Sequence, residues 1–237
     1  MVPRNPNWFE PHVCMTGNVV RTLARMGYAK DDRVLKALDW LLGQQLEDGG
    51  WNCSTRDGGK HGSFHATIEP LWGLSEMLGT NGANEKWRDS AKRASEFLLK
   101  HRIYKSDRDG SIILLDFLKL HYPIHYRYDI LHALRVLTEF GIVDDPRMND
   151  AVGQLLEKRL PDGSWPLEAV YRGWRLPFAF HGGTRTYRPE ELELITQGWG
   201  EEHTQQLEEA GKPSKWITLQ ALLVLKRIGV LGFDSAD

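Results

Sequence analysis

Apolar residues in this chain recur every three to four positions, which is the spacing of an amphipathic helix. Over 19–26 they keep this spacing until Gly27, and a glycine directly after such a run is typical of a helix C-cap. A second apolar series follows Asp31 and Asp32, either of which can cap a helix N-terminus. That series ends at the Asp-Gly-Gly turn at 48–50, which a helix interior does not tolerate cheaply. The pattern predicts a helical hairpin closed by an Asp-Gly turn.

The same hairpin pattern returns later in the chain without a gap. Residues 19–51 align with 133–165, an offset of 114 positions (133 minus 19). Self-similarity over such a length indicates stacked supersecondary units, each with an inner and an outer helix. The matching positions include arginine, glycine, aspartate and tryptophan: Arg21 and Arg135, Gly27 and Gly141, Asp48 and Asp162, Gly49 and Gly163, Trp51 and Trp165.

Two weaker copies extend the series. One begins at 63–79 and ends at an eroded turn at Asp109-Gly110, and the last begins at 213–229 and lacks a second helix. We expect a single repeat domain over 1–237, interrupted by an aromatic-rich insert at 166–212 with one short helix near 200–209. The hairpin units are expected at about 12–53, 63–113, 121–168 and 213–232. Their inner helices are expected near 15–27, 65–78, 128–140 and 215–228.

Composition narrows the class of protein. The net charge of -2 and the mixed charge pattern argue against a nucleic-acid partner. No apolar run approaches the roughly 20 residues that span a bilayer, so no transmembrane segment is expected. Cys14 and Cys53 are too few for a disulfide framework, and with no apolar signal stretch we expect a cytoplasmic location. Nine tryptophans are a surplus that can line an apolar cavity or fill a core.

The motif Gln-x-x-Asp-Gly-Gly-Trp at 45–51 resembles the repeat of squalene/oxidosqualene cyclases and protein prenyltransferase β-subunits. Residues 158–165 form a degenerate second copy, and the segments 63–74 and 125–137 resemble bacterial proteins with prenyltransferase and squalene oxidase repeats. The resemblance covers nearly the whole chain outside 166–212. It implies an all-α fold of the α/α-toroid type, here an incomplete ring of about three and a half hairpins.

The resemblance implies a protein that binds an isoprenoid or other apolar substrate in a concave helical pocket. The chain lacks the Asp-x-Asp-Asp acid motif of the cyclases that protonate an alkene, so whether it is an enzyme stays open. It also has fewer hairpins than those enzymes use to close a ring. We therefore expect an arc, a piece of a longer toroid, or one half of a homodimer.

The repeat register places four residues at the first turn of successive inner helices: Cys14, His65, Tyr128 and Trp216. Equivalent positions in a curved stack point toward one axis, so these side chains are expected to gather at one mouth of the concave face. The alternative is that this position simply favours a bulky, partly polar residue. Trp216, Trp72, His65 and Tyr126 are the expected substrate-binding side chains, whereas Trp51 and Trp165 belong to outer turns and are expected to be structural.

A zinc site is one hypothesis for the first inner helices. By resemblance, prenyltransferase zinc is held by Asp, Cys and His at the starts of inner helices, although His12 stands where that Asp would be. Two thiolates with imidazoles suit Zn²⁺. The expected ligands are Cys14, Cys53, His65 and His61. The alternative is two buried structural thiols and two ordinary histidines.

Ionisable groups crowd the start of the third inner helix. Asp129 can orient His125 or Tyr128 as a general acid or base, and these three are the catalytic candidates. Aspartate at a helix start is also an ordinary N-cap. Glu69 shares a helix face with His65, and it is expected either to tune that imidazole through a hydrogen bond or to form half of a surface pair.

Two other functions remain open. One is a non-catalytic binding or assembly module, as other helical solenoids are. A homodimer partner, or the insert at 166–212 folding back, is expected to cover the apolar flank of the last inner helix, formed by Leu219, Leu222, Leu223 and Leu225. The other is an α/α-barrel carbohydrate-active enzyme, for which Asp129 and Glu69 are the candidate carboxylates.

Overall fold

The computed structural model describes residues 11–53, 55, 58–81, 84–124, 127–169 and 208–230. The chain divides into two compact units, Met1–His101 and Arg102–Asp237. The described residues of both units are mostly helical, and their two strands are two residues long each, so the predicted all-α class is confirmed. The single domain and the toroid stay predictions.

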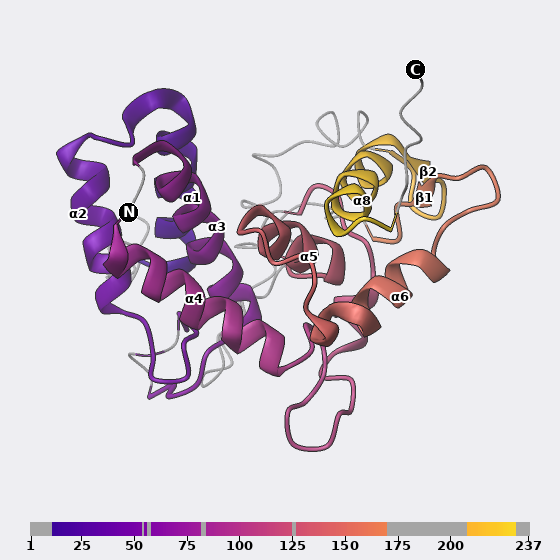
Figure 1. The fold of residues 1–237 in the computed structure, drawn as a ribbon, viewed down its shortest axis with the longest axis horizontal. Coiled ribbons are helices and arrows are strands. Elements are labelled where there is room, and N and C mark those ends of the chain that lie inside the picture. Colours follow the sequence, from indigo (N-terminus) through magenta and orange to yellow (C-terminus); the bar gives the residue numbers. More distant parts are fainter. Residues whose placement is uncertain are drawn as a thin grey trace, which may run out of the picture. The chain divides into compact units, whose positions relative to one another are not determined.

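The first unit contains two consecutive helical hairpins, α1 with α2 and α3 with α4 (Figure 1). Its helices are α1 (Val13–Leu23), α2 (Asp32–Gly43), α3 (Phe64–Asn81) and α4 (Glu85–Lys100), and a π-helical turn over Ala24–Tyr28 follows α1. The inner helices α1 and α3 pack against each other, and each also contacts its own outer helix. This is the predicted order of helix, turn, helix and Asp-Gly turn.

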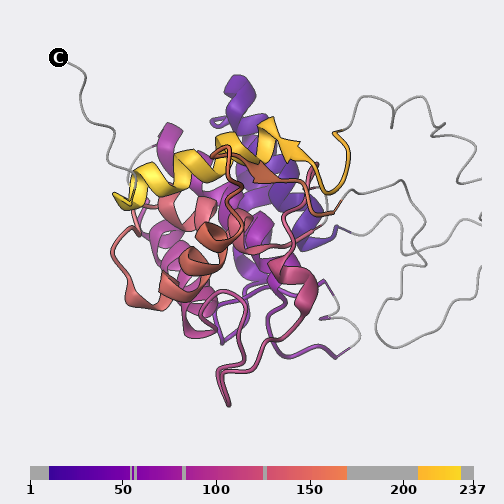
Figure 2. The ribbon, with the colours of Figure 1, turned by 90° about the vertical axis from the view of Figure 1, so that its right-hand side faces the viewer.

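The second unit repeats the hairpin and adds a last inner helix. Its helices are α5 (Ile130–Glu139), α6 (Asn149–Glu157) and α8 (Lys215–Ile228), with 3₁₀ turns over Leu115–Leu118 and Pro146–Met148. Strand β1 (Trp165–Pro166) pairs antiparallel with β2 (Pro213–Ser214), and β2 leads directly into α8, which lies alongside α5 (Figure 2). The four expected inner helices thus correspond to α1, α3, α5 and α8. The short helix expected near 200–209 lies almost wholly outside the described residues.

The repeat extends to individual hydrogen bonds of the tryptophan turns. The indole N–H of Trp51 donates to the carbonyl of Leu41 in α2 at 2.8 Å. At the equivalent place, the indole N–H of Trp165 donates to the carbonyl of Leu155 in α6 at 2.7 Å. Both indoles are fully buried, so each satisfies its own polar group while it fills the gap beneath an outer helix. The structural role expected for both tryptophans is confirmed.

The backbone of each tryptophan also joins one hairpin to the next inner helix. The N–H of Trp51 donates to the hydroxyl of Thr67 in α3, and that of Trp165 donates to the hydroxyl of Thr218 in α8, both at 2.9 Å. Thr67 and Thr218 occupy the same register position, because Thr67 lies two residues after His65 and Thr218 lies two residues after Trp216. The turn therefore fixes where each following inner helix begins.

The start of α2 and the start of the 3₁₀ turn that leads into α6 are capped in the same way. Asp31 accepts hydrogen bonds from the backbone N–H and the guanidinium of Arg33, and Asp145 does the same with Arg147. These hydrogen bonds lower the pKa of Asp31 to about 2 and also lower the pKa of Asp145. Of the two N-cap candidates considered for α2, Asp31 is the one that caps.

Close backbone approach joins α1 to α3. A Cβ atom added to Gly17 would lie 2.5 Å from the nitrogen of Pro70, and one added to Gly73 would lie 2.9 Å from the carbonyl oxygen of Gly17. Glycine on one helix and proline without an N–H on the other leave no atoms to keep the backbones apart. Pro70 lies well inside α3, because the helix begins at Phe64.

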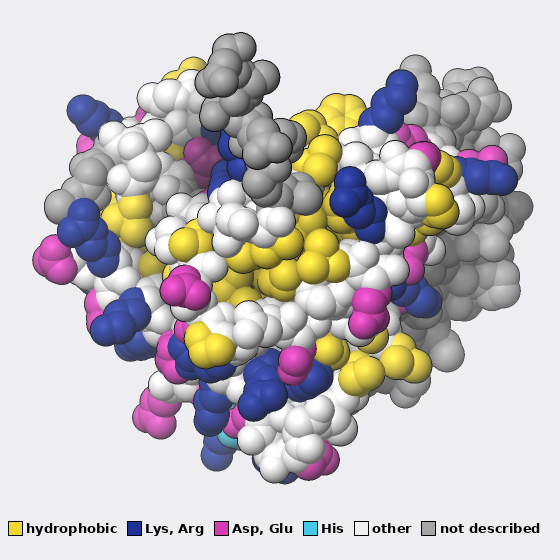
Figure 3. Space-filling model, turned by 45° about the vertical axis from the view of Figure 1, so that its right-hand side comes forward, with side chains coloured by type: hydrophobic (Ala, Val, Ile, Leu, Met, Phe, Trp, Pro, Cys, Tyr) yellow, Lys and Arg dark blue, Asp and Glu magenta, His cyan; other side chains and the backbone are white. Residues whose placement is uncertain are grey.

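The described surface carries interspersed charges of both signs, with hydrophobic side chains among them (Figure 3). Within the described ranges, each helix is too short or too polar to cross a bilayer.

Candidate functional site

The two cysteines of the first unit lie in contact. Cys14 is in the first turn of α1 and buried, and Cys53 is half-buried two residues beyond Trp51, on the loop that leaves the Asp-Gly-Gly turn. Their sulfur atoms are 3.2 Å apart and share a hydrogen bond, although neither residue is in a disulfide. The sequence placed both cysteines in one candidate cluster, and the structure brings them together.

The shared hydrogen bond makes the two thiols different. It lowers the pKa of Cys53 to about 6, helped by the nearby charge of His12, and it raises the pKa of Cys14, together with burial. Cys53 is therefore the more acidic thiol of the pair. His12 is the residue directly before α1. From the sequence, it was noted only because it stands where prenyltransferases have an aspartate zinc ligand.

The histidines expected to complete a zinc site do not join this pair as a ligand set. The side chain of His61 is 88% exposed, with its Nδ1 3.9 Å from the carboxylate of Asp48, and His65 is half-buried in the first turn of α3. In the part of the chain that the structure describes, no three His, Cys, Asp or Glu side chains gather as they would around a metal ion. The zinc site with these four ligands therefore stays a prediction.

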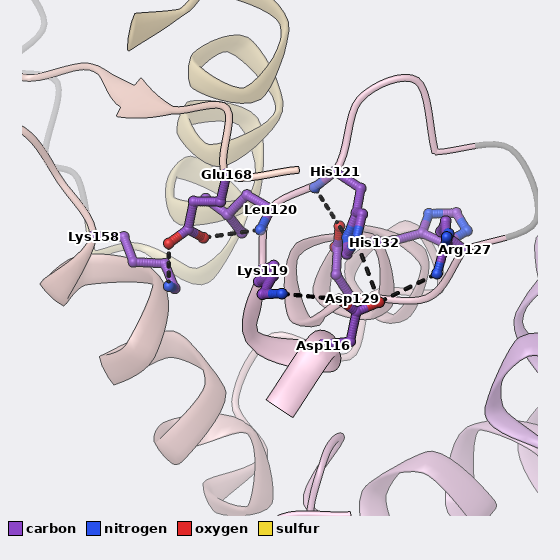
Figure 4. Close-up of polar contacts among 9 residues, drawn as sticks. All are labelled: Asp116, Lys119, Leu120, His121, Arg127, Asp129, His132, Lys158 and Glu168. Atoms are coloured by element: carbon purple, nitrogen blue, oxygen red, sulfur yellow. Dashed lines mark hydrogen bonds and ion pairs between the residues drawn. The ribbon is translucent and has the colours of Figure 1, made fainter. Parts of the chain in front are cut away.

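Asp129 is the N-cap of α5 and the centre of a buried polar cluster (Figure 4). One carboxylate oxygen accepts from the backbone N–H of His132 at 2.8 Å. The other accepts from the backbone N–H of His121 at 2.9 Å and lies 3.3 Å from the Nδ1 atom of the same residue. The capping role considered from the sequence is confirmed, and the imidazole that Asp129 contacts is that of His121.

A second carboxylate faces the other side of the His121 ring. Asp116, from the 3₁₀ turn, lies 3.6 Å from His121 Nε2 and also contacts Arg127 at 3.3 Å and Lys119 at 3.4 Å (Figure 4). The imidazole is almost fully buried between two carboxylates, one buried and one partly exposed. Sequence reasoning missed Asp116, because the 3₁₀ turn lies outside the repeat register that selected the candidates.

The other catalytic candidates differ in their surroundings. Tyr128 is 1% exposed, and its hydroxyl donates to the carbonyl of Ile103 at 2.6 Å. Burial and the neighbouring charge of Asp129 raise its pKa well above the ordinary value, so it stays a neutral phenol. His125 and Tyr126 lie outside the described residues.

The two tryptophans expected to bind substrate are in opposite environments. Trp216, in the first turn of α8, is 50% exposed and stacks on Tyr122, with 5.2 Å between ring centroids and 9° between ring planes. Trp72 is buried in α3, with the guanidinium carbon of Arg21 3.2 Å from the centroid of its ring. Trp216 is thus available to a ligand, and Trp72 belongs to the α1–α3 contact.

The four residues that share a register position at the start of the inner helices therefore differ in their burial. Within the second unit, Tyr128 is enclosed in the core while Trp216 reaches the surface. Within the first, Cys14 is buried and His65 is half-buried. How deeply the residue in the first turn of each inner helix is buried depends on the segments that pack around that hairpin.

Glu69 is also a buried group. It is 1% exposed on α3, which excludes the surface pair considered from the sequence. Its charge contributes to raising the pKa of Cys14, so it lies near the thiol pair. Asp129, the other carboxylate of the carbohydrate hypothesis, is 1% exposed in the second unit. Neither carboxylate is presented to solvent, and the carbohydrate hypothesis gains no support.

Comparison with protein-family models, with curated proteins and with solved structures finds no match to this chain.

Proposed function

We propose that this chain is a helical-repeat protein of the cyclase and prenyltransferase type that binds an isoprenoid or another apolar molecule. One observation carries the proposal: the half-exposed indole of Trp216, stacked on Tyr122, begins an apolar stripe along α8. Leu219 and Leu223 follow at helical spacing and are also exposed. A flat aromatic pair next to branched aliphatic side chains suits the methyl-rich chain of an isoprenoid.

The proposal is for binding, and it assigns no reaction. The hydroxyl of Tyr128 donates its hydrogen bond to a backbone carbonyl. Both oxygens of Asp129 accept hydrogen bonds that stabilise the start of α5. A general acid or base must reach the reacting proton. Neither group is presented to a ligand on the α8 stripe, so we do not assign either of them to catalysis.

Equilibrium dialysis with radiolabelled farnesol tests the binding proposal. Trp216→Ala should weaken binding by about tenfold, because truncating a central aromatic anchor usually costs at least about 1.4 kcal/mol. Leu115→Ala is the matched control, because Leu115 is an exposed leucine of the same unit outside α8. Equal binding by the wild type and both variants would contradict the proposal.

A second candidate function, assembly with another copy of the chain, is favoured by the repeat register. Subtracting the offset of 202 positions (216 minus 14), the α8 stripe corresponds to Cys14, Gly17 and Arg21 of α1. Gly17 and Arg21 lie on the face of α1 that packs on α3, where Gly17 approaches Pro70 and Arg21 lies over the ring of Trp72. The stripe on α8 is thus equivalent to the face of α1 against which the next inner helix, α3, packs.

The complementary face is exposed at the other end of the series. Met15 and Val19 of α1, with Met26 just beyond it, are exposed. In α3 the equivalent residues, 51 positions later, are buried, and they include Pro70, which contacts Gly17. Among the described residues, the face of α1 that corresponds to the α1-contacting face of α3 has no preceding inner helix against it. Within the same residues, the face of α8 that corresponds to the α3-contacting face of α1 has no following inner helix against it. A second copy would pair these faces head to tail.

The predicted leucine flank divides accordingly. Leu219 and Leu223 are exposed, as a docking face requires, and Leu222 is half-buried. Leu225 is fully buried in α8, so its place in the predicted flank is wrong. The reason is that Leu225 follows Leu223 by two residues, roughly 200° around the helix axis, and so lies on the side of α8 that packs into its own unit.

Sedimentation velocity over a range of protein concentrations separates the two functions. Head-to-tail assembly requires that Val19→Asp and Leu223→Asp each abolish association, while Leu115→Asp leaves it unchanged. Association lost in Leu223→Asp but kept in Val19→Asp would indicate symmetric α8 pairing instead. A wild type that stays monomeric throughout would contradict assembly and leave the binding proposal standing.

A further inference from the structure

The cysteine pair of the first unit has a geometry that neither apolar-ligand binding nor assembly uses. Sulfur atoms 3.2 Å apart need to approach by only about 1 Å to reach the roughly 2.05 Å length of a disulfide bond. The two residues come from different elements, the first turn of α1 and the loop after Trp51, separated by 39 positions in the sequence. Their contact is therefore produced by tertiary packing.

We propose that Cys14 and Cys53 form a reversible dithiol–disulfide pair that exchanges with small-molecule disulfides. Cys53 is the attacking residue, because it is the less buried of the two. Cys14 is the resolving residue, because it is buried in direct contact with the Cys53 sulfur. A more accessible attacking thiolate next to a more protected second thiol favours thiol–disulfide exchange.

The exchange proceeds in two displacements. The Cys53 thiolate attacks one sulfur of the reagent disulfide, forms a mixed disulfide and releases one thiolate. Cys14 loses its proton to solvent and attacks the Cys53 sulfur, forming the bond between the two protein sulfurs and releasing the second thiolate. Two protein thiols are oxidised by two electrons, and the reagent disulfide is reduced to two thiols. An excess of the reduced thiol reverses both steps.

The surroundings of the pair favour formation of the intramolecular disulfide over a mixed disulfide that stays on Cys53. Cys14 lies in the first turn of α1, where backbone N–H groups and the helix dipole favour a thiolate as it forms. Contact between the two sulfurs makes the second displacement intramolecular, so it should outpace attack by a second molecule of reagent. The bond would tie the start of α1 to the loop after the first Asp-Gly-Gly turn and close a long chain segment between them.

The full-length protein should be incubated in glutathione buffers of fixed oxidised-to-reduced ratio, quenched in acid and alkylated. Peptide mass spectrometry should find one intramolecular disulfide between Cys14 and Cys53 in oxidising buffer and two alkylated thiols in reducing buffer. Cys14→Ser should stop the reaction at a stable glutathione adduct on Cys53. Cys53→Ser should lose nearly all reaction, because only the buried thiol remains.

The wild-type result decides the proposal without the variants. A glutathione adduct on Cys53 that persists in the wild type would overturn it, as would two thiols that remain reduced in fully oxidised glutathione. A disulfide that excess reduced glutathione fails to open would also overturn it, because the bond would then be a permanent cross-link. Circular dichroism of each serine variant establishes that its helices are retained.

Discussion

A cysteine with a low pKa reacts at pH values where ordinary thiols are protonated. Because the hydrogen bond with Cys14 lowers the pKa of Cys53 to about 6, its alkylation by iodoacetamide should be half-maximal near pH 6 and constant above about pH 7. An ordinary cysteine reaches half of its maximal rate near about pH 8.5. Site-resolved mass spectrometry across this pH range measures the profile of each cysteine.

The partner residue is the control for this profile. In Cys14→Ala the hydrogen bond is lost, so the midpoint for Cys53 should move upward toward that of an ordinary thiol. A midpoint of about 8.5 in the wild type would contradict the lowered pKa of Cys53.

The tryptophans of the Asp-Gly turns combine packing with a hydrogen bond. Trp51→Phe should lower the free energy of unfolding by about 2 to 4 kcal/mol, because it leaves a void beneath α2 and removes the donor to Leu41. Trp165→Phe should cost a similar amount, since its contacts in the second unit are equivalent. Urea unfolding followed by circular dichroism measures both. A loss below about 1 kcal/mol would mean that neither the void nor the bond matters.

At the scale of elements, the α1–α3 contact depends on the absence of side-chain atoms. Gly17→Ala should destabilise the protein by about 1 to 3 kcal/mol, because the new methyl group would meet the backbone of Pro70. Gly79→Ala is the matched control: Gly79 also lies in a helix, and an added Cβ atom there meets nothing within 4 Å. That change should be neutral or stabilising by up to about 1 kcal/mol. Equal effects of the two substitutions in urea titrations would refute the close-approach argument.

The start of α5 depends on one buried carboxylate. Asp129→Ala should cost roughly 2 to 4 kcal/mol, because it removes the N-cap and leaves two buried backbone N–H groups without their acceptor. Asp129→Asn retains one acceptor oxygen and should cost less. Thermal unfolding of the two variants would give the order, and the reverse order would exclude capping as the main role of Asp129.

At the scale of the whole molecule, aspartates in both units make stability depend on pH. The folded-state pKa values of Asp31, Asp145 and Asp150 are lowered, chiefly by hydrogen bonds from neighbouring arginine or lysine side chains. The unfolded chain therefore binds protons more tightly than the folded chain. The stabilisation is complete above the unfolded pKa of about 4 and is lost as the pH falls through the lower folded values.

Calorimetry should accordingly find Tm constant from about pH 7 to 5 and falling below about pH 4. Asp145→Asn keeps a capping oxygen at the start of its outer helix but removes the charge, so its Tm should fall less steeply with acid. A Tm that is unchanged down to about pH 2 would contradict the contribution of these carboxylates.

The hairpins, their order and their turns could be predicted from the sequence because the features that determine them are local. Apolar spacing selects the inner face of each helix, a capping aspartate such as Asp31 selects its start, and a glycine such as Gly27 with a positive φ selects its end. Trp51 and Trp165 could be assigned to structural positions from the register alone.

The candidate site could be predicted only in part. Sequence reasoning gathered Cys14 and Cys53 into one cluster as candidate zinc ligands but added His61, which the structure places at the surface. It also overlooked Asp116, which reaches His121 from a 3₁₀ turn that belongs to no repeat. Contacts across loops depend on where a chain segment returns in space, and no spacing along the sequence records that.

The sequence by itself determined that this protein is a series of helical hairpins with repeated caps and tryptophan turns. Only the tertiary structure decided which copies of the same helix face are covered. Gly17 and Leu219 share a register position, yet one is buried against α3 and the other is exposed. The physical reason is that a helix face is buried by the neighbour that follows it in the stack, whatever its own residues are.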